Sequence, residues 1–330
     1  MGGTRQKILA LMIEKGDGFV SGEEISRRIG LSRTAVWKHI EELRREGYQI
    51  EARQKSGYRL VCRPDLILKE EIALHLSTRT FGRALRTLKS VESTQQIAHQ
   101  WAREGAPEGA AVIAEEQTAG RGRLGRFWHS PPDSGIWMSL ILRPPIPIAQ
   151  APQLTLMASV GVTRALIRET GLAIRIKWPN DLLIGDKKVC GILTELRGEQ
   201  DRVHYVVLGI GINVNTGEEM WPPELRTKVT SLSAEAGRTF RRAVLIAAIL
   251  EEMEQVYDRY LNRGFSAIRG EWERLSGMPG RFVTAWTQNG DVSGIARGLN
   301  EDGALLLETE KGLISVYSAE ISEGCETRPF

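Results

Sequence analysis

The sequence predicts a multidomain α+β protein. With 330 residues, the chain is longer than most single domains. Its first part has helical spacing and then an alternating hairpin, its middle part has strands in succession without regularly alternating helices, and its last part has short strands separated by turn dipeptides. These three patterns predict domains over residues 1–64, 66–275 and 279–326.

Composition places the chain among ordinary globular proteins, with 42% hydrophobic and 26% charged residues. Cys62, Cys190 and Cys325 are odd in number and far apart, without metal-ligand or disulfide spacing, which predicts a reducing cytoplasm. The N-terminus carries no apolar signal segment. The longest uncharged run, Pro144 to Thr163, is broken by prolines, so no membrane span is expected.

Basic charge is concentrated at the N-terminus. Residues 1–64 hold 13 Lys and Arg against 8 Asp and Glu, a net charge of +5, whereas the remainder holds 31 against 33, a net charge of −2. The N-terminal segment is therefore where a nucleic-acid contact is expected.

Two helices open the N-terminal domain. Apolar residues recur at helical spacing over Thr4–Lys15. A capping box, with Ser21 as N-cap and Glu24 three residues later, begins a second helix that ends at Gly30.

A third helix follows after a turn of only a residue or two, with Ser32 as its N-cap. Val36, Ile40 and Leu43 form its apolar face, and Trp37 borders this face, so we expect Trp37 in the core. Two capped helices and a tight turn are typical of a helix-turn-helix that presents its second helix to a major groove.

Two alternating segments, Tyr48–Ala52 and Tyr58–Val61, form a wing after the third helix. The side chains expected to face DNA are polar or basic and lie on the third helix, its N-cap and the wing: Ser32, Arg33, Thr34, Lys38, Arg53 and Lys55. For any one of them a solvated charged surface is the alternative, but together they favour DNA binding.

Strands dominate the remaining two domains. In the central domain, strands are predicted over Val112–Gln117, Gly135–Leu142, Lys188–Leu196 and Val203–Asn213, and long helices over Pro152–Glu169 and Ala243–Arg263. After residue 279, the predicted strands are Val283–Trp286, Val292–Ala296, Ala304–Glu308 and Leu313–Tyr317, with hairpin turns at Asn289-Gly290 and Asp302-Gly303, as in a small barrel.

The run from Gly120 to Arg126 spaces three arginines with glycines. Glycine allows close backbone approach to a ligand, and arginine offers planar donors to carboxylate or phosphate. Such a loop fits a small molecule that carries both groups. The alternative, an Arg-Gly tract that binds RNA, usually repeats within low-complexity sequence, whereas this run is single.

Four motifs occur in the order and spacing of the biotin–protein ligase family, and the chain resembles that family from about residue 85 to its end. They are the Gly120–Arg126 run with Glu116–Gly120 directly before it, Lys177–Asp181, Lys188–Leu193 and Gly209–Asn213. With its N-terminal module, the chain looks like the branch of the family that joins a biotin ligase to a repressor of the biotin operon.

The resemblance implies a class II synthetase-like mixed sheet in the centre and an SH3-like barrel at the C-terminus. It implies two reactions: ATP and biotin form biotinyl-5′-AMP with the help of Mg²⁺, and a lysine of a biotin carboxyl carrier domain then takes the biotinyl group. It further implies a homodimer when the adenylate is bound, with the adenylate as corepressor.

Site residues follow from the same match. Lys188, Arg121 and Arg123 correspond to catalytic positions. Biotin-binding positions are Ser93, Thr94, Gln95, Gln117, Gly120, Arg121, Gly122, Arg123, Lys188 and Gly191, and nucleotide-binding positions are Arg123, Trp128, Asn180, Asp181, Lys188 and Asn213. Residue 95 is Gln where many relatives carry Asn. No residue is assigned as a metal ligand.

Several of these residues have a second interpretation. Ser93 also suits the N-cap of a helix over 95–103, and Asn213 a turn at a strand end. Trp128 suits the core as well as adenine, Asp181 suits either the ordering of Lys188 or magnesium, and Asn180 suits support of the turn. For Arg126, which is further along the loop, a salt bridge and solvent exposure are both open.

Two other functions compete with this one. A lipoate–protein ligase shares the fold and the adenylation chemistry, but the Gly-Arg run and the N-terminal module would be unexpected in it. A transcription factor that only binds a ligand would not need the lysine and arginine set. The sequence contains no metalloprotease helix, serine-hydrolase elbow or Walker loop, and Val214 stands where a dinucleotide fingerprint needs glycine.

Overall fold

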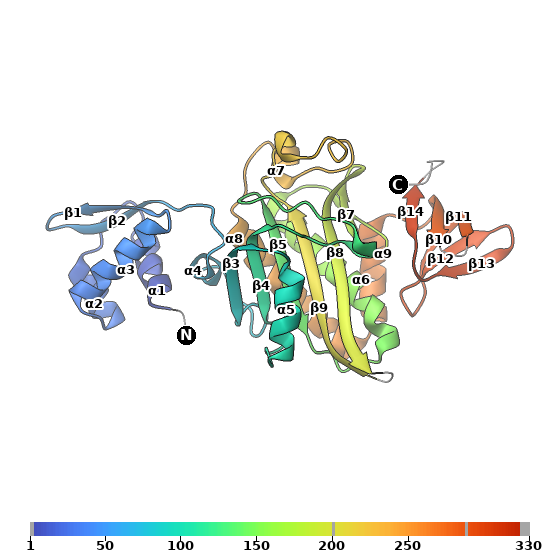
Figure 1. The fold of residues 1–330 in the computed structure, drawn as a ribbon, viewed down its shortest axis with the longest axis horizontal. Helices are drawn as coiled ribbons and strands as arrows, with labels where there is room; N and C mark the ends of the chain where they lie inside the picture. Colours follow the sequence, from blue (N-terminus) through green and yellow to red (C-terminus); the bar gives the residue numbers. More distant parts are fainter. Residues whose placement is uncertain (1–2, 200–201, 288–289, 324–330) are drawn as a thin grey trace. The chain divides into compact units, whose positions relative to one another are not determined.

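The computed structural model describes residues 3–199, 202–287 and 290–323, which form two compact units on either side of the Leu76–Ser77 bond (Figure 1). Asn289 of one predicted hairpin turn, Cys325 and the end of the third predicted domain lie outside the described residues. None of the described helices is long and apolar enough to span a membrane.

The first unit is a helix-turn-helix with a hairpin, as predicted. Both N-caps are confirmed, since the backbone N–H of Glu24 donates to Ser21 Oγ (3.0 Å) and that of Ala35 to Ser32 Oγ (3.2 Å). Gly30 ends the second helix with a φ of 78°. The elements are α1 (Thr4–Glu14), α2 (Gly22–Ile29), α3 (Arg33–Arg45), β1 (Gln49–Arg53), β2 (Gly57–Cys62) and α4 (Lys69–Ala73).

The core of this unit includes Val36, Ile40 and Leu43 of α3, as predicted, but not Trp37. Trp37 is 54% exposed, so the prediction that it belongs to the core is wrong. The physical reason is angular. Consecutive helical residues are about 100° apart, and the step from Val36 takes Trp37 off the apolar stripe.

Helix α4 belongs to the first unit, which therefore continues to Leu76, beyond the boundary at residue 64 that the sequence predicts. Glu71 of α4 is fully buried, accepts a hydrogen bond from Tyr48 Oη (2.7 Å) and pairs with Arg63 (2.6 Å). A short helix held by polar contacts produces no hydrophobic period, so the pattern of the sequence does not reveal it.

A mixed sheet of seven strands is the centre of the second unit, in the order β3-β4-β5-β9-β8-β7-β6. Only β3 and β4 are parallel neighbours, and the other pairs are antiparallel. The strands are β3 (Leu85–Val91), β4 (Ala111–Gln117), β5 (Gly135–Leu142), β6 (Ile174–Lys177), β7 (Asp181–Ile184), β8 (Lys187–Glu199) and β9 (Arg202–Asn213). The four predicted central strands are confirmed, whereas β3, β6 and β7 were not predicted.

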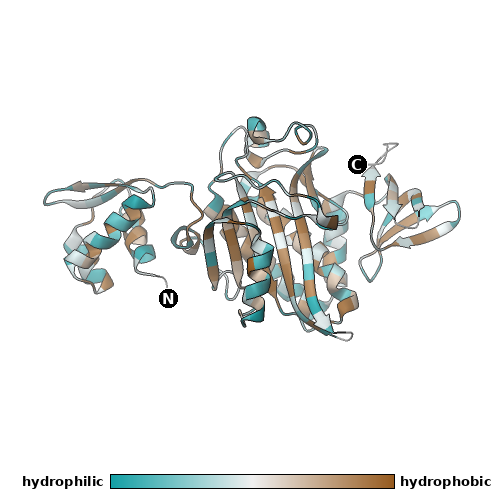
Figure 2. Ribbon diagram, in the orientation of Figure 1, coloured by the Kyte–Doolittle hydropathy of each residue, from teal (hydrophilic) through white to brown (hydrophobic). Residues whose placement is uncertain are grey.

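Helices cover both faces of this sheet (Figure 1). Helix α5 packs on β4, β5 and β9, and the long helices α6 and α8 pack against each other on the opposite face. Apolar residues dominate the central strands of this sheet (Figure 2). The helices are α5 (Thr94–Arg103), α6 (Ala151–Thr170), α7 (Leu232–Ala236), α8 (Arg242–Arg263) and α9 (Ser266–Ser276), of which α5, α6 and α8 were predicted.

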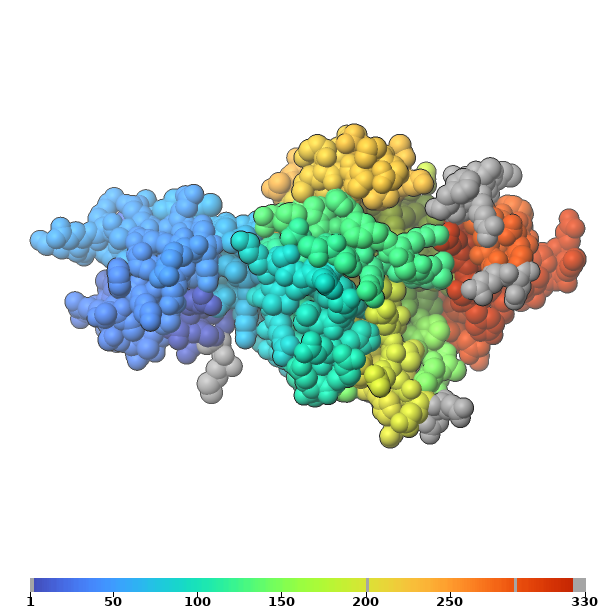
Figure 3. All heavy atoms as spheres, viewed as in Figure 1, coloured from blue at the N-terminus to red at the C-terminus, as the bar shows by residue number. Residues whose placement is uncertain are grey.

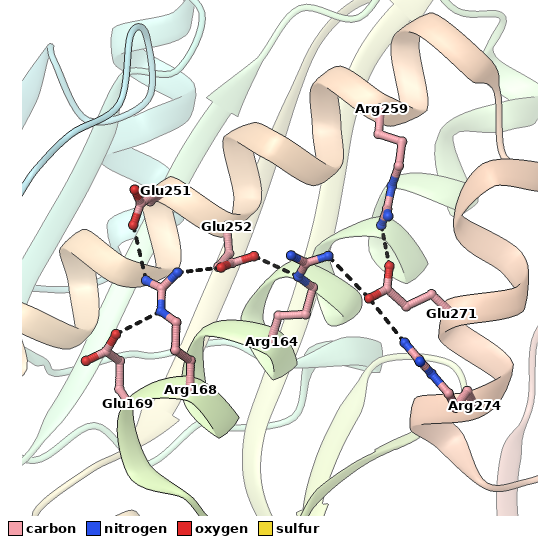
Figure 4. Close-up of polar contacts among 8 residues, drawn as sticks. All are labelled: Arg164, Arg168, Glu169, Glu251, Glu252, Arg259, Glu271 and Arg274. Carbon is pink, nitrogen blue, oxygen red and sulfur yellow. Dashed lines mark hydrogen bonds and ion pairs between the residues drawn. The ribbon is translucent and has the colours of Figure 1, made fainter.

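An ion-pair network joins α6, α8 and α9 (Figure 4). Arg164 of α6 pairs with Glu252 of α8 (2.7 Å) and Glu271 of α9 (3.3 Å). Each of these carboxylates pairs with more than one arginine. The entropy cost of ordering one glutamate side chain is therefore shared by several ion pairs. The remaining members are Arg168, Glu169, Glu251, Arg259 and Arg274.

The C-terminal part is a five-stranded antiparallel sheet in the order β13-β12-β11-β10-β14. Among the described residues no pairing joins the outer strands β13 and β14, so these five strands form an open sheet and not a closed barrel. The four predicted strands are confirmed, with β14 in addition. The strands are β10 (Phe282–Thr287), β11 (Gly290–Leu299), β12 (Leu305–Thr309), β13 (Gly312–Val316) and β14 (Glu320–Glu323).

Glu254 of α8 holds the segment that leads into β3. Its carboxylate accepts hydrogen bonds from the backbone N–H groups of Arg79 (2.8 Å), Thr80 (2.6 Å) and Phe81 (3.0 Å). Burial opposes ionisation here, but the three backbone donors outweigh it and lower the pKa of Glu254.

Because the pKa of Glu254 is lower in the folded state, its charge stabilises the fold at pH values above the unfolded pKa of the carboxyl. This stabilisation is lost as the pH falls through the folded pKa. We expect Glu254→Gln to lower the thermal midpoint at pH 7, and this deficit to shrink when both proteins are measured near pH 4. Glu310→Gln, at an exposed turn, is the control. A deficit that stays constant with pH would contradict the role given to the charge of Glu254.

Candidate active site

A cavity of about 310 Å³ opens in the second unit, where β7, β8 and β9 meet the Gly-Arg loop. Every residue that the sequence assigns to small-molecule binding lines this cavity except Gly120. Gly120 is the first residue of the loop, and a Cβ added to it would be 2.5 Å from the carbonyl oxygen of Trp128. Glycine therefore permits the close approach of the two backbone segments at Gly120 and Trp128.

Lys188 occupies the centre of the site through the pairing of β7 with β8. Its Nζ lies 2.6 Å from Asp181 Oδ1 and 5.2 Å from the centroid of the Trp128 ring. Its backbone is fixed as well, since its N–H donates to the carbonyl of Lys228 (2.9 Å). Of the two interpretations of Asp181, the geometry favours the ordering of Lys188.

The indole of Trp128 lies on two facing glycines of the sheet, Gly191 of β8 and Gly211 of β9. An added Cβ would be 2.9 Å from the Trp128 ring at Gly191 and 2.5 Å from Trp128 Nε1 at Gly211. Trp128 Nε1 is buried without a hydrogen-bond partner among the described residues. The ring therefore lines the cavity over the sheet and leaves a free donor there.

Neutral polar side chains form one end of the cavity. The backbone N–H of Thr94 donates to Gln117 Oε1 (2.9 Å), and Gln117 Nε2 donates to Ser130 Oγ (3.0 Å). Ser93 precedes α5, but among the described residues its hydroxyl makes no capping hydrogen bond and is buried without a partner. Ser93 therefore occupies the N-cap position of α5 without capping it through its side chain. Its hydroxyl remains available to a ligand.

The Gly-Arg loop is attached at two places. Arg123 donates to Asn180 Oδ1 (3.0 Å) and to Ser318 Oγ (3.2 Å), and Arg126 pairs with Glu320. Burial lowers the pKa of Arg123, although the nearby carboxylates of Asp181 and Glu320 oppose this effect. Both alternatives for Arg126 are observed, since its side chain makes the salt bridge and is 55% exposed.

The two asparagines of the site are buried and oriented. Asn180 Nδ2 donates to the carbonyl of Ile192 (2.9 Å), so this residue connects β8 with the Gly-Arg loop as well as following Pro179. Asn213 Nδ2 donates to the carbonyl of Thr230 (3.0 Å), whereas its Oδ1 is buried without a partner in the described part of the chain. That oxygen is free to accept a hydrogen bond from a ligand.

One wall of the cavity was not predicted. The segment that follows β9 lies over the end of the sheet (Figures 1 and 3) and contributes Trp221, Leu225 and Val229 to the lining. The signal in the sequence is weak, because these are single apolar residues within a loop rich in Pro, Glu and Gly. Large apolar side chains in such a loop indicate a functional surface only once the fold brings them together.

Positive charge exceeds negative charge in the cavity. Its acidic members, Asp181 and Glu320, are each already paired with a cation, while Arg121 and Arg123 add further charge. Within the described ranges, no group of three or more His, Cys, Asp or Glu side chains is arranged to hold a metal ion. The cavity therefore suits an anionic ligand with phosphate or carboxylate groups.

The side chains predicted to face DNA are exposed on the first unit. Arg33 pairs with Glu23 (2.6 Å), and Arg53 pairs with Glu51 (3.5 Å) and lies 4.8 Å above the Phe19 ring. Ser32 caps α3, and Lys55 lies in the hairpin turn with a φ of 64°. These positions form one α3 surface and one wing surface.

Three family models match in the order of the three predicted domains. An HTH domain matches residues 4–59, the biotin/lipoate A/B protein ligase family matches residues 87–213, and the biotin protein ligase C terminal domain matches residues 280–323. The "Bifunctional ligase/repressor BirA" of Bacillus subtilis (strain 168) is 47% identical over 320 residues, which are 97% of this chain and 98% of the relative. The chain belongs to this family of bifunctional biotin ligase/repressors.

More distant relatives agree. The protein of the same name from Escherichia coli (strain K12) is 32% identical over 95% of this chain and 97% of its own length. The solved structure titled "Biotin protein ligase from Aquifex aeolicus in complex with biotin and ATP" is similar with a TM-score of 0.65 and 31% identity, over 73% of this chain and all of that one.

The packing of Trp128 against the sheet gives a direct test of the cavity. We expect Gly211→Ala to displace the indole and to destabilise the protein by about 1–3 kcal/mol, the usual cost of overpacking. Gly270→Ala is the matched control, because open space surrounds Gly270 on helix α9 and alanine favours a helix. Denaturant unfolding measures both variants, and a neutral Gly211→Ala would contradict the contact.

Proposed function

We propose that the protein is an ATP-dependent biotin–protein ligase that also represses biotin biosynthesis genes. The observation that carries the proposal is the position of Lys188, ordered by Asp181 between the Gly-Arg loop and the neutral polar end of one cavity. The names of the relatives, with a helix-turn-helix in the first unit, support both halves of the proposal.

In the first reaction, an oxygen of the biotin carboxylate attacks the α-phosphorus of ATP, the bond to pyrophosphate breaks, and biotinyl-5′-AMP forms. Two anions must meet, so the site has to neutralise charge before bond formation. Lys188, Arg121 and Arg123 line the cavity and supply positive charge to it. Arg123 is pre-oriented by Asn180.

The neutral end of the cavity matches the ureido ring of biotin, which offers one carbonyl and two N–H groups. Ser93, Thr94 and Gln117 line this end, and the Ser93 hydroxyl has no partner among the described residues. A site that hydrogen-bonds a buried neutral ring rejects ligands without those groups. This argument favours biotin over lipoate, as does the match of the biotin-specific C-terminal domain model.

In the second reaction, the amine of a carrier-domain lysine attacks the acyl carbonyl, the bond to the phosphate oxygen breaks, and AMP leaves. The adenylate must be protected from water until then. We propose that the Gly120–Arg126 loop closes over it and is mobile without ligand. The contacts of Arg123 and Arg126 are with single side chains, so the loop can exchange them for phosphate oxygens.

Magnesium is proposed as a companion of the nucleotide. Mg²⁺ usually takes one or two carboxylates together with substrate phosphates, and not a cage of protein ligands. The one carboxylate that the lining offers beside Lys188 is Asp181, which would hold the ion in addition to its contact with the lysine. When bound, the ion would share the neutralisation of the triphosphate.

Several finer features remain part of the proposal. The central mixed sheet is consistent with a class II synthetase-like domain over 66–275, and the C-terminal antiparallel sheet with an SH3-like barrel over 279–326. The DNA-binding domain is proposed over 1–64, with residues 65–76 attached to it. A cytoplasmic location is proposed from cysteine usage.

Lys188→Ala tests the ligase half. Because it removes the central charge partner of the reacting groups, we expect biotin-dependent ATP–pyrophosphate exchange to fall on the order of 10²-fold or more. Lys187→Ala, at the exposed neighbouring position, should stay near wild type. Exchange that survives in Lys188→Ala at the level of Lys187→Ala would disprove this assignment.

Repression requires a two-fold arrangement. One winged module reads one half-site, so we propose that biotinyl-5′-AMP promotes a homodimer that binds a palindromic operator. The adenylate then favours the dimer and the dimer favours DNA, which is a thermodynamic linkage. Abundant carrier domain would consume the adenylate and relieve repression.

Replacing Lys38 or Arg53 by alanine tests the DNA surface. Each change should weaken operator binding and reduce the dependence of log affinity on log salt by about one if it removes one phosphate contact. Lys7→Ala, exposed on α1, is the control. The measurement is binding of the full chain with biotinyl-5′-AMP over a salt series, and equal behaviour of all three variants would contradict the assigned surface.

A further inference from the structure

Trp37 lies within the surface of α3 that is expected to face DNA, and its side chain is 54% exposed. It follows Arg33 by four positions and Thr34 by three, so these side chains are neighbours on one face of the helix. Lys38 is beside them. Because α3 begins at Arg33, this face belongs to its first two turns, and the first turns of a recognition helix meet the base edges of the major groove.

The neighbours of Trp37 make its exposure informative. A single exposed apolar side chain is ordinary on a protein surface. Here, however, the other exposed side chains of the face are polar or basic. The indole does not belong to the core of the first unit, and among the described residues it makes no hydrogen bond, ring contact or cation–π contact. Folding of the first unit therefore does not account for a tryptophan at this position.

Charge favours DNA as the partner that covers the indole. Residues 1–64 carry a net charge of +5, which attracts a polyanion. Two carboxylates beside this face are already paired, since Glu23 contacts Arg33 (2.6 Å) and Glu41, one turn after Trp37, contacts Arg44 (2.6 Å). Neither carboxylate therefore presents an uncompensated negative charge to DNA.

The chemistry of the indole selects what it can contact in a major groove. It offers a wide apolar ring and a single N–H donor, without charge. Phosphate oxygens are best matched by cations, whereas the apolar group that base edges present in the major groove is the C5-methyl of thymine. An indole that lies against this methyl removes apolar surface of both groups from water.

We infer that Trp37 is a specificity-determining residue that recognises one thymine in each half-site by apolar contact with its methyl group. The inference rests on the proposed repressor function, and it adds the base that one residue selects. The surface then has two kinds of contact. Lys38 and Arg53 are proposed to position the domain through phosphates, whereas Trp37 contributes to the choice of sequence.

The test begins with DNA that the protein itself selects. The full chain with biotinyl-5′-AMP is incubated with a library of random-sequence duplexes, and the bound duplexes are sequenced. The selection is repeated with Trp37→Ala and Trp37→Phe. We expect wild type to enrich a palindrome, and Trp37→Ala to lose the preference for thymine at one position of each half-site. Trp37→Phe keeps an apolar ring and should keep that preference.

Uracil in place of this thymine removes only the methyl group. With one half-site changed in this way, the affinity of wild type should fall about 4-fold, as for one methyl group no longer buried. Trp37→Ala should bind the unchanged duplex about 10-fold more weakly than wild type and should not respond to uracil. Its slope of log affinity against log salt should equal that of wild type, because an indole displaces no counterion.

Ile13→Ala is the matched control, because Ile13 is another exposed large apolar side chain of the first unit, on α1 (39% exposed). It should select the same palindrome as wild type and show the same response to uracil. Thermal unfolding checks the fold of each variant. The uracil measurement on wild type needs no variant, so it tests the methyl contact even if a substitution at Trp37 disturbs folding.

Two results would overturn the inference alone. One is a palindrome selected equally by wild type and Trp37→Ala. The other is a loss of affinity in Trp37→Ala with a reduced salt slope and an unchanged response to uracil, which would make Trp37 a support for a phosphate contact. A wild-type chain that enriches no sequence would instead overturn the proposed repressor function and the inference with it.

Discussion

Charge neutralisation is the constraint on which the site depends. A carboxylate and a triphosphate approach each other only where protein cations exceed protein carboxylates and water is limited. The sheet satisfies this by pairing β7 with β8, which brings Asp181 against Lys188 and orders the lysine without cancelling the remaining arginines. The Gly-Arg loop adds further charge, and we propose that its arginines exchange Asn180, Ser318 and Glu320 for a ligand.

Space is the second requirement, and glycine provides it within an otherwise packed sheet. Gly191 and Gly211 are direct cross-strand partners, and the absence of side chains there lets the Trp128 ring lie on the strands. Trp128 Nε1, Ser93 Oγ and Asn213 Oδ1 line this space and are buried without a hydrogen-bond partner among the described residues. Buried polar atoms without partners are costly, so these three favour a ligand with matching groups.

Local chemistry explains which parts of the fold were predictable. The caps at Ser21 and Ser32 and the left-handed Gly30 depend on neighbouring residues only, and each was predicted correctly. Strands β6 and β7 have four residues each, too few for a period, and α4 is held by polar contacts that connect distant positions. Trp37 was placed in the core because it follows the apolar Val36, but one helical step turns its side chain about 100° away from the buried face.

The motif residues line one cavity, whereas the contacts that support them depend on tertiary structure and were not predicted. The sequence alone left the role of Gln95 open, and only the fold brings Glu195, a hundred positions later, against its amide. All proposed ligand-binding residues lie in the second unit and all proposed DNA-binding residues in the first. Glu71 fastens α4 to the first unit, which ends at Leu76. Association of two chains, as proposed, links the adenylate in the second unit to DNA binding by the first and needs no change within either unit.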